Sequence, residues 1–413
     1  MIFSSGAVLN GGLIMKTETS PLLTRQRDYW FDNIKGVLMI FVVIGHMTAS
    51  FYSVSGGIKY IYDCINSMHM GTFLILSGYM SKGRVARKDY VGVINKNIIP
   101  YITAQVFLYV YANLIPRGFK GMAIEFFDCS TFSFFIPIYQ LWYLMAVIIF
   151  VLVTIKLKPE RRPVLFMIGA IALTLICGAI PQVKIFRLTK IISHYPFFLL
   201  GYLLPKDFML ALRNKKKLII AALAVFAGYA YFMSRQDWVV NIRSIYGLSG
   251  TYKSGGELAF GIHPVFGRLA MILFIPIVAF AFYTVMPRCK TIFSKLGQNS
   301  MYIFVLHSLV VCGFRCLNYE HGILKKYLMT PTAKALFLVF SVAVAFILGS
   351  ELIRKIFRPL LEPKIDIVNI VGVLYGKYRE REDARVAEVK EVKAVNEVTE
   401  AKESTEAKEG SDS

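Results

Sequence analysis

The sequence predicts an all-α polytopic membrane protein with about ten transmembrane helices in one bundle, and three observations indicate this class. Apolar residues make up 56% of the 413-residue chain, above the ~45–50% that is usual in soluble domains. The mean hydropathy is +0.54, and ten windows of about 20 residues are apolar enough to cross a bilayer. Most Lys and Arg residues fall between these windows rather than within them.

The candidate spans follow one another along the chain, each about the length that a helix needs to cross the ~30 Å hydrocarbon core. The second span is interrupted by Asp63, Asn66 and His69, and the sixth carries Lys190 and His194. The ten spans are 34–54, 60–80, 98–115, 137–155, 163–181, 187–204, 217–233, 264–286, 298–317 and 334–353.

The distribution of basic residues predicts the orientation of the bundle. If the N-terminus is cytoplasmic, the connections 82–96, 156–162, 206–217 and 288–295 lie inside, and they carry more Lys and Arg than the outer connections. An excess of basic residues marks the cytoplasmic side of membrane proteins. An even number of spans then places the C-terminus in the cytoplasm as well.

The chain divides into one membrane domain and two tails. We expect a cytoplasmic N-terminal tail at 1–26, a membrane domain at 27–357, and a polar cytoplasmic tail at 358–413 that is disordered or partly helical. Met15 followed by KTETS resembles a natural start, so residues 1–14 are interpreted as an untranslated stretch.

Several common functional classes are disfavoured. The basic residues lie at helix ends instead of forming one stripe with interleaved aromatic residues, so no nucleic-acid partner is expected. The six cysteines form no CxxC pair, and no metal site is expected. Glycine-rich phosphate loops, GxSxG elbows and HExxH motifs are also absent from the sequence.

Ionisable residues inside the predicted spans point to a function within the membrane. Lys35 and His46 are eleven residues apart, which returns a helix to within ~20° of the same face and separates them by ~16 Å along its axis. His46 is placed about two turns from the outer end of its span, and the depths of His69 and His307 are compatible with a shared cavity. A buried imidazole can instead be a packed residue that donates one hydrogen bond, the interpretation favoured for His194.

Six sequence blocks occur in a fixed order along the chain. The blocks are RDYWFDNIKGVLMIFVVIGH at 27–46, SMHMGTFLILSGY at 67–79, IIPY at 98–101, LWYL at 141–144, YPFFLLGYLL at 195–204 and LGQNSMYIFVLH at 296–307. Together they resemble the acyltransferase family 3 integral-membrane proteins, in particular the branch similar to fucose 4-O-acetylase. The resemblance spans roughly residues 27–357 and implies a ten-helix enzyme of the cell membrane. Such an enzyme takes an acyl group, usually acetyl from cytoplasmic acetyl-CoA, and delivers it to a hydroxyl of a cell-envelope or exported carbohydrate.

The resemblance carries specific residues onto this chain. In the first block Lys35 and His46 match the family's basic residue and histidine, with Lys in the place of the more usual Arg. A lysine keeps the positive charge but loses the bidentate fork of arginine. In the second block Met68 and Gly71 depart from the family's Phe and Pro. The other residues carried over as site candidates are His69, Ser77, Tyr79, Trp142, Tyr302 and His307.

The chemistry of O-acylation suits these residue types. A sugar hydroxyl needs a base when it attacks a thioester, and a neutral imidazole, with an ordinary pKa near ~6.5, suits that role. His46 is the first candidate, followed by His69 and His307. Asp32 is expected to pair with Lys35. Lys82 and Arg84, at the inner end of the second span, either bind the phosphates of CoA or serve only to fix the topology.

Two other classes remain open at this point. Histidines also form proton relays, so a proton-coupled exporter of a glycan or small anion is the main alternative, although no internal repeat is visible. A non-catalytic scaffold would leave the intramembrane histidines unexplained. The sequence leaves open whether the acyl group is acetyl or succinyl, which sugar accepts it, whether an acyl-histidine forms, and the oligomeric state.

Overall fold

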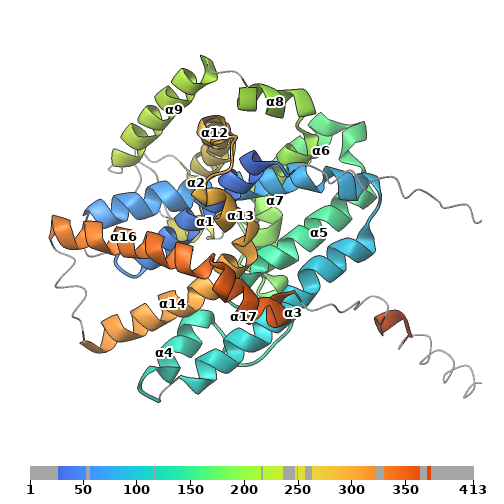
Figure 1. Cartoon of the computed structure of the whole chain (residues 1–413). Helices are drawn as coiled ribbons and strands as arrows, with labels where there is room; N and C mark the ends of the chain where they lie inside the picture. The colour runs from blue at the N-terminus through green and yellow to red at the C-terminus, as the bar shows by residue number, and fades with distance from the viewer. Residues whose placement is uncertain are drawn as a thin grey trace, which may run out of the picture.

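The computed structural model describes residues 27–52, 56–115, 117–214, 217–235, 247–248, 250–255, 263–321, 330–362 and 370–373. Every regular element that it defines in these ranges is a helix, which confirms the all-α class (Figure 1). The α-helices are α1 Tyr29–Ala49, α2 Gly56–Ala86, α3 Tyr90–Leu114, α4 Arg117–Phe127, α5 Trp142–Leu157, α6 Pro163–Cys177, α7 Leu188–Leu203, α8 Lys206–Asn214, α9 Lys217–Ser234, α11 Tyr252–Gly255, α12 Pro264–Val285, α13 Ile292–Gln298, α14 Ser300–His321, α16 Pro331–Leu348 and α17 Glu351–Leu361, and the 3-10 helices are η1 Tyr139–Leu141, η2 Pro159–Arg161 and η3 Ile185–Arg187.

Six helices of the described residues are long and apolar enough to cross a membrane. They are α1, η1 with α5, α9, α12, α14 as far as Leu317, and α16. The other four predicted spans also fall on helices, namely α2, α3, α6 and α7. Of these, α2 and α3 are long but less apolar, while α6 and α7 have only 15 and 16 residues. The protein is therefore a polytopic membrane protein; the count of ten spans and the cytoplasmic termini stay predictions.

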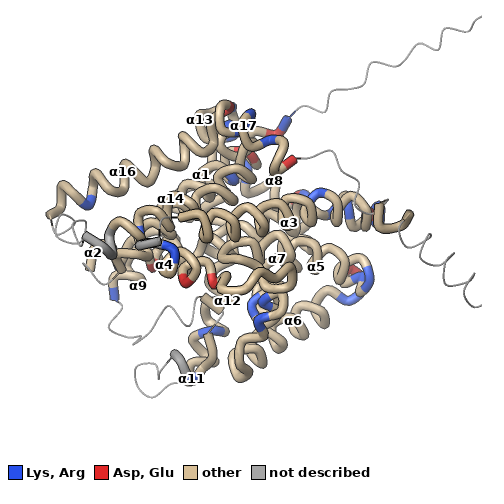
Figure 2. Tube along the Cα trace, turned by 90° about the horizontal axis from the view of Figure 1, so that it is seen from below, with Lys and Arg blue, Asp and Glu red and all other residues tan. Residues whose placement is uncertain are grey.

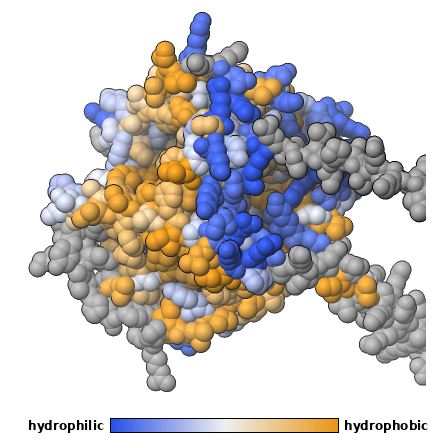
Figure 3. Space-filling model, viewed as in Figure 1, coloured by the Kyte–Doolittle hydropathy of each residue, from blue (hydrophilic) through white to orange (hydrophobic). Residues whose placement is uncertain are grey.

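The surface agrees with a membrane location. In Figure 2 the Lys and Arg positions gather around α13 and α17 and at the end of α5, while most helix middles carry neither sign of charge. Figure 3 shows a broad apolar surface beside a hydrophilic band that runs over the part of the molecule where Figure 1 places α13 and α17. The apolar surface is suited to lipid tails, since hydrocarbon favours apolar side chains.

The first helix begins and ends earlier than the predicted span 34–54. Asp28 caps it by accepting a 3.1 Å hydrogen bond from the Trp30 amide, and the helix ends at Ala49. An aspartate at this position satisfies an amide that the helix itself leaves unpaired. As a result His46 lies in the last turn of α1, not two turns from its end.

The rotation of α1 about its axis is fixed by close contact with α13, which lies beside it near the middle of the bundle (Figure 1). A Cβ built on Gly36 would lie 2.1 Å from the carbonyl oxygen of Phe293, and one on Gly297 would lie 1.9 Å from that of Asp32. Only glycine permits such backbone contact. The buried Asn33 side chain also donates to the carbonyls of Pro287 and Cys289, at 2.9 and 2.8 Å.

Helices α2 and α7 are packed in the same way. A Cβ on Gly78 would lie 1.9 Å from the Phe198 carbonyl oxygen, and one on Gly201 would lie 1.8 Å from that of Ile75. At the level of His46, Gly45 allows the Asn66 side chain of α2 to approach α1, because a Cβ there would be 3.0 Å from its nitrogen. These contacts bring α1, α2 and α7, which carry His46, His69 and His194, into one tightly packed group.

The segment before α5 enters the bundle as an irregular chain held by amide side chains. Gln105 of α3 donates to the carbonyls of Ser133 and Ile136, at 2.7 and 2.6 Å, and accepts from the Ile138 amide at 3.0 Å. Gln140 donates to Ser308 Oγ of α14 at 3.0 Å. Irregular backbone at membrane depth needs such internal partners. The chain thus reaches η1 in a defined position among α3, α5 and α14.

Candidate active site

Three histidines that are far apart in the sequence meet in the bundle. The ring centroids of His46 on α1 and His307 on α14 are 5.1 Å apart, and the ring planes are inclined by 31°. His69 on α2 is close enough to interact electrostatically with both of them. The structure therefore brings together all three histidines proposed from the sequence as catalytic.

The hydrogen bonds of two histidines define their tautomers. Nδ1 of His69 is 2.9 Å from the Ile65 carbonyl oxygen, and Nδ1 of His307 is 3.0 Å from that of Ile303. Because a carbonyl can only accept, Nδ1 carries the proton in each ring and Nε2 has the free lone pair. Nε2 of His307 is buried with no hydrogen-bond partner in the described part of the chain.

His46 is held differently, by a residue that the sequence analysis did not single out. Its Nδ1 lies 2.6 Å from the hydroxyl oxygen of Tyr139, which can donate or accept. Tyr139, the first residue of η1, adopts a left-handed backbone conformation with φ of 47°. The sequence had no motif that marks this tyrosine, because the contact depends on how the segment folds into the bundle.

Lys190 is the second residue that the sequence analysis missed as a site candidate. Its Nζ lies 4.2 Å from the ring centroid of Trp142, and it interacts electrostatically with His46 and His69. No acidic side chain within the described ranges forms a salt bridge with it. His194 donates from Nδ1 to the Lys190 carbonyl at 2.7 Å, which agrees with a packing role for that histidine.

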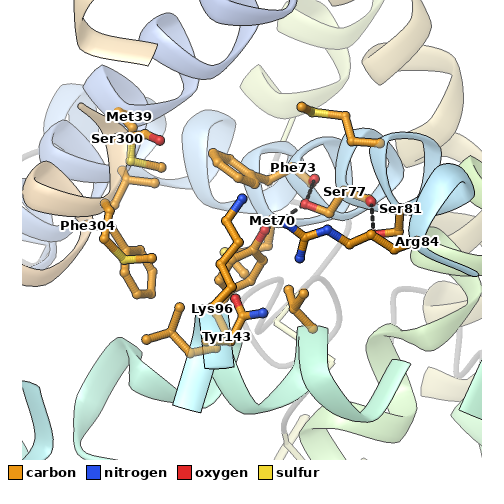
Figure 4. Close-up of a pocket in the computed structure, with 16 residues that line it drawn as sticks. Met39, Met70, Phe73, Ser77, Ser81, Arg84, Lys96, Tyr143, Ser300 and Phe304 are labelled. Atoms are coloured by element: carbon orange, nitrogen blue, oxygen red, sulfur yellow. Dashed lines mark hydrogen bonds between the residues drawn. The ribbon is translucent and has the colours of Figure 1, made fainter. Parts of the chain in front are cut away.

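A cavity of about 310 Å³ lies close to two of these histidines, and Figure 4 shows the residues that line it. Val42, in its wall, lies one helical turn before His46 on α1, and Phe304 lies three residues before His307, with ring centroids 6.4 Å apart. The lining residues are Met39, Val42, Met70, Phe73, Ser77, Met80, Ser81, Arg84, Lys96, Asn97, Tyr143, Leu144, Val147, Ser300, Met301 and Phe304.

The cavity combines an apolar wall with a basic end. Ser77 Oγ is 2.6 Å from the Tyr143 hydroxyl and donates to the Phe73 carbonyl at 2.9 Å. In Figure 4 the side chains of Lys96 and Arg84 extend into the space from two helices. Lys96 also interacts electrostatically with Lys35. This end therefore presents a cluster of positive charge at the side predicted to face the cytoplasm.

The remaining candidates from the first helix form an ion-pair network instead of lining the cavity. Lys35 Nζ lies 2.8 Å from Asp32 Oδ1, as predicted, and Arg27 Nε lies 2.6 Å from Asp32 Oδ2. Asp32 is buried, whereas Arg27 is largely exposed. The network anchors the start of α1 close to the basic end of the cavity.

Lys82 and Arg84 have different environments. Lys82 donates to the Leu204 carbonyl, and its ammonium lies 5.1 Å from the ring centroid of Tyr79. Burial lowers the pKa of Lys82. Arg84 lines the cavity, while Lys82, Tyr79, Trp142 and Tyr302 are not among the residues that line it. Of the binding candidates taken from the sequence, Ser77 and Arg84 are thus the two that meet the cavity.

The cavity is large enough for a small ligand, and histidines able to act as acid or base lie near one end of it. These features are typical of an enzyme whose active site lies within the membrane. The described residues contain no group of three or more His, Cys, Asp or Glu side chains able to bind a metal ion. The chain belongs to the family described as Acyltransferase domain, which matches residues 28–350. It is therefore an acyltransferase.

The chain is also similar to two nodulation proteins. The chain is 26% identical over 193 residues to the nodulation protein NolL of Mesorhizobium japonicum, covering 44% of this chain and 49% of the relative. It is 27% identical over 221 residues to NolL of Sinorhizobium fredii, covering 48% and 56%. The matches thus span about half the length of these relatives. No solved structure matches the chain.

Proposed function

We propose that this acyltransferase is an O-acyltransferase of the cell membrane that moves an acyl group, most simply acetyl, from acyl-CoA to a hydroxyl of a cell-envelope or exported carbohydrate. The observation that carries this proposal is the cavity, which has Arg84 and Lys96 at one end and the cluster of His46, His69 and His307 just beyond the other. Family membership supports the acyl transfer. The carbohydrate acceptor rests on the resemblance to fucose 4-O-acetylase.

The basic end suits the anionic part of acyl-CoA. Its phosphates carry several negative charges, and the guanidinium of Arg84 can bind a phosphate through two parallel hydrogen bonds. Lys96 adds a second positive charge from α3, and Lys35 contributes from α1 despite its pairing with Asp32. The phosphates of acyl-CoA are assigned to this end of the cavity, and the nucleotide base lies outside the cavity.

The apolar wall suits the rest of the donor. Methionine, valine and phenylalanine side chains line the space between Arg84 and the histidines, and methionine adapts well to flexible chains. Ser77 and Tyr143 supply hydroxyls midway, where the amide groups of the pantetheine arm need partners. In this arrangement the thioester reaches the level of Val42 and Phe304, one turn from the imidazoles.

His46 acts as the general base in the proposed reaction. It removes the proton from the sugar hydroxyl as the oxygen forms a bond to the thioester carbonyl carbon. The C–S bond then breaks, the new ester is released, and the thiolate of CoA takes the proton back from the imidazolium. His69 and His307 are the reserve candidates, and an acyl-histidine intermediate is the alternative to direct transfer.

Lys190 is suited to stabilising the charge that develops during this reaction. Attack on the thioester places negative charge on its carbonyl oxygen, and a fixed cation in a site of low dielectric stabilises that charge strongly. Lys190 has no salt-bridge partner among the described residues, so its ammonium is available for this purpose. Its contact with Trp142 fixes its position beside the histidines.

The test measures transfer of a radiolabelled acetyl group from acetyl-CoA to a glycan by the purified protein. It is done in detergent, where there is no membrane gradient that could drive transport. The protein is incubated with radiolabelled acetyl-CoA and a panel of cell-envelope glycans, and the glycan is then isolated and counted. We expect labelled O-acetyl esters that mild base releases. If neither acetyl-CoA nor succinyl-CoA labels any carbohydrate while the folded protein transfers acyl groups from another donor, the proposed donor is wrong.

A further inference from the structure

We infer that Tyr139 is a positioning residue for His46: its hydroxyl accepts the Nδ1–H of the imidazole and so directs the Nε2 lone pair toward the acceptor hydroxyl. This inference rests on the proposed function, since it assigns a partner to the proposed base. The role is one of orientation, because Tyr139 acts through His46 and not on the substrate.

The first observation is that His46 is bonded unlike the other histidines of the predicted spans. His69, His194 and His307 each direct Nδ1 to the carbonyl four residues earlier on their own helix. His46 instead directs Nδ1 to Tyr139, at 2.6 Å, on another element. The imidazole of His46 therefore bonds away from its own helix, and its orientation depends on the side chain of Tyr139.

The second observation is that the chain around Tyr139 is strongly constrained. A non-glycine residue with φ of 47° is strained and persists only where its surroundings fix it. Gln105 bonds three backbone groups just before Tyr139, and Gln140 bonds α14 just after it. Strain of this kind concentrates where a side chain must be held in one place.

The third observation concerns the ring of Tyr139, which is packed without using its hydroxyl. Its centroid lies 4.6 Å from that of Phe126 and 6.3 Å from that of Phe127 on α4. The rings of Tyr139 and His46 are inclined by 56°, with centroids 5.1 Å apart. Removing only the hydroxyl therefore leaves the ring in its packing and isolates the hydrogen bond to His46.

The test uses Tyr139→Phe, with Tyr101→Phe as the matched control because Tyr101 supports the same segment without touching His46. Protein labelled with ¹⁵N-histidine is studied by NMR, and His46→Ala identifies the signals of His46. We expect wild-type His46 to be protonated on Nδ1, Tyr139→Phe to mix the two tautomers, and Tyr101→Phe to leave the signals unchanged.

Kinetics supply the second readout. Tyr139→Phe should lower kcat by about 10- to 100-fold, less than loss of the base itself, with the KM for acetyl-CoA unchanged. A wild-type His46 protonated on Nε2, or signals that Tyr139→Phe does not alter, would overturn the inference. Because the NMR result needs no substrate, the expected tautomers in a protein that fails to acylate glycans would support the positioning and contradict only the proposed function.

Discussion

The imidazoles of His46 and His307 lie 5.1 Å apart, centroid to centroid, although they belong to the first helix and to a helix near the end of the membrane domain. At this distance the two rings cannot readily be imidazolium cations at the same time, since like charges repel strongly at short distance. One ring can therefore act as a base while its neighbour stays neutral. This pair, just beyond the end of the cavity that lies opposite Arg84 and Lys96, is the basis of the chemistry proposed for the protein.

The basic end of the cavity is tested by Arg84→Ala and Lys96→Ala. Each substitution should raise the KM for acetyl-CoA roughly tenfold, the effect of ~1.4 kcal/mol of lost binding, with little change in kcat. The reason is that phosphate contacts far from the thioester stabilise ground state and transition state alike. Steady-state kinetics with varied acetyl-CoA measure both constants.

Lys82→Ala is the matched control for this prediction. Lys82 lies two residues before Arg84 but bonds the Leu204 carbonyl instead of lining the cavity. Removal of the Lys82 side chain should leave the KM for acetyl-CoA within about twofold of wild type. This is a smaller rise than the loss of one hydrogen bond to a charged group would cause. A larger rise in KM for Lys82→Ala than for Arg84→Ala would contradict the assignment of the phosphates.

Lys190→Met tests stabilisation of the developing oxyanion. Methionine keeps most of the length of the side chain and removes the charge, so the contact with Trp142 is largely preserved. We expect kcat to fall about 10²–10³-fold, as for loss of an oxyanion donor, while the KM for acetyl-CoA changes little. Lys184→Met, an exposed position nearby in the sequence, serves as the control. Normal turnover by Lys190→Met would remove this residue from the mechanism.

Gly78→Ala tests the close contact of α2 and α7. The new methyl group would lie 1.9 Å from the Phe198 carbonyl oxygen, and backbone atoms cannot move aside as side chains do. Destabilisation of ~1–3 kcal/mol or more is expected, measured as a lower thermal midpoint in detergent. Gly228→Ala, in α9, has open space at its Cβ and should be neutral or slightly stabilising. Equal midpoints for the two variants would contradict the packing.

The helical fold and the histidine cluster were predictable from the sequence. Each apolar window became a helix, because burial of apolar side chains in lipid or protein dominates at this length. The histidines stood out because hydrocarbon excludes ionisable groups that have no function. The start of α1 was also open to prediction, since Asp28 before an apolar run is a typical N-terminal cap.

The rest of the site depends on contacts between elements. Tyr139 reaches His46 only because Gln105 and Gln140 hold an irregular segment inside the bundle, which no periodicity reveals. The different environments of Lys82 and Arg84 could have been predicted from the sequence. Two residues correspond to ~200° around a helix, so the two side chains lie on different faces. Lys190 could also have been singled out from the sequence. It lies four residues before His194, so both polar side chains share one face of an otherwise apolar span.

The most direct test of the central claim is the rate of acyl transfer by His46→Ala, measured with labelled acetyl-CoA on protein that is shown to be inserted and folded. Loss of a general base typically costs ~10²–10⁴ in rate, so the account predicts a residual rate of about 1% or less. Normal expression and thermal stability would show that the loss is chemical. Transfer at more than about a tenth of the wild-type rate, above what loss of a base allows, would contradict the assignment and direct the search to His69 and His307.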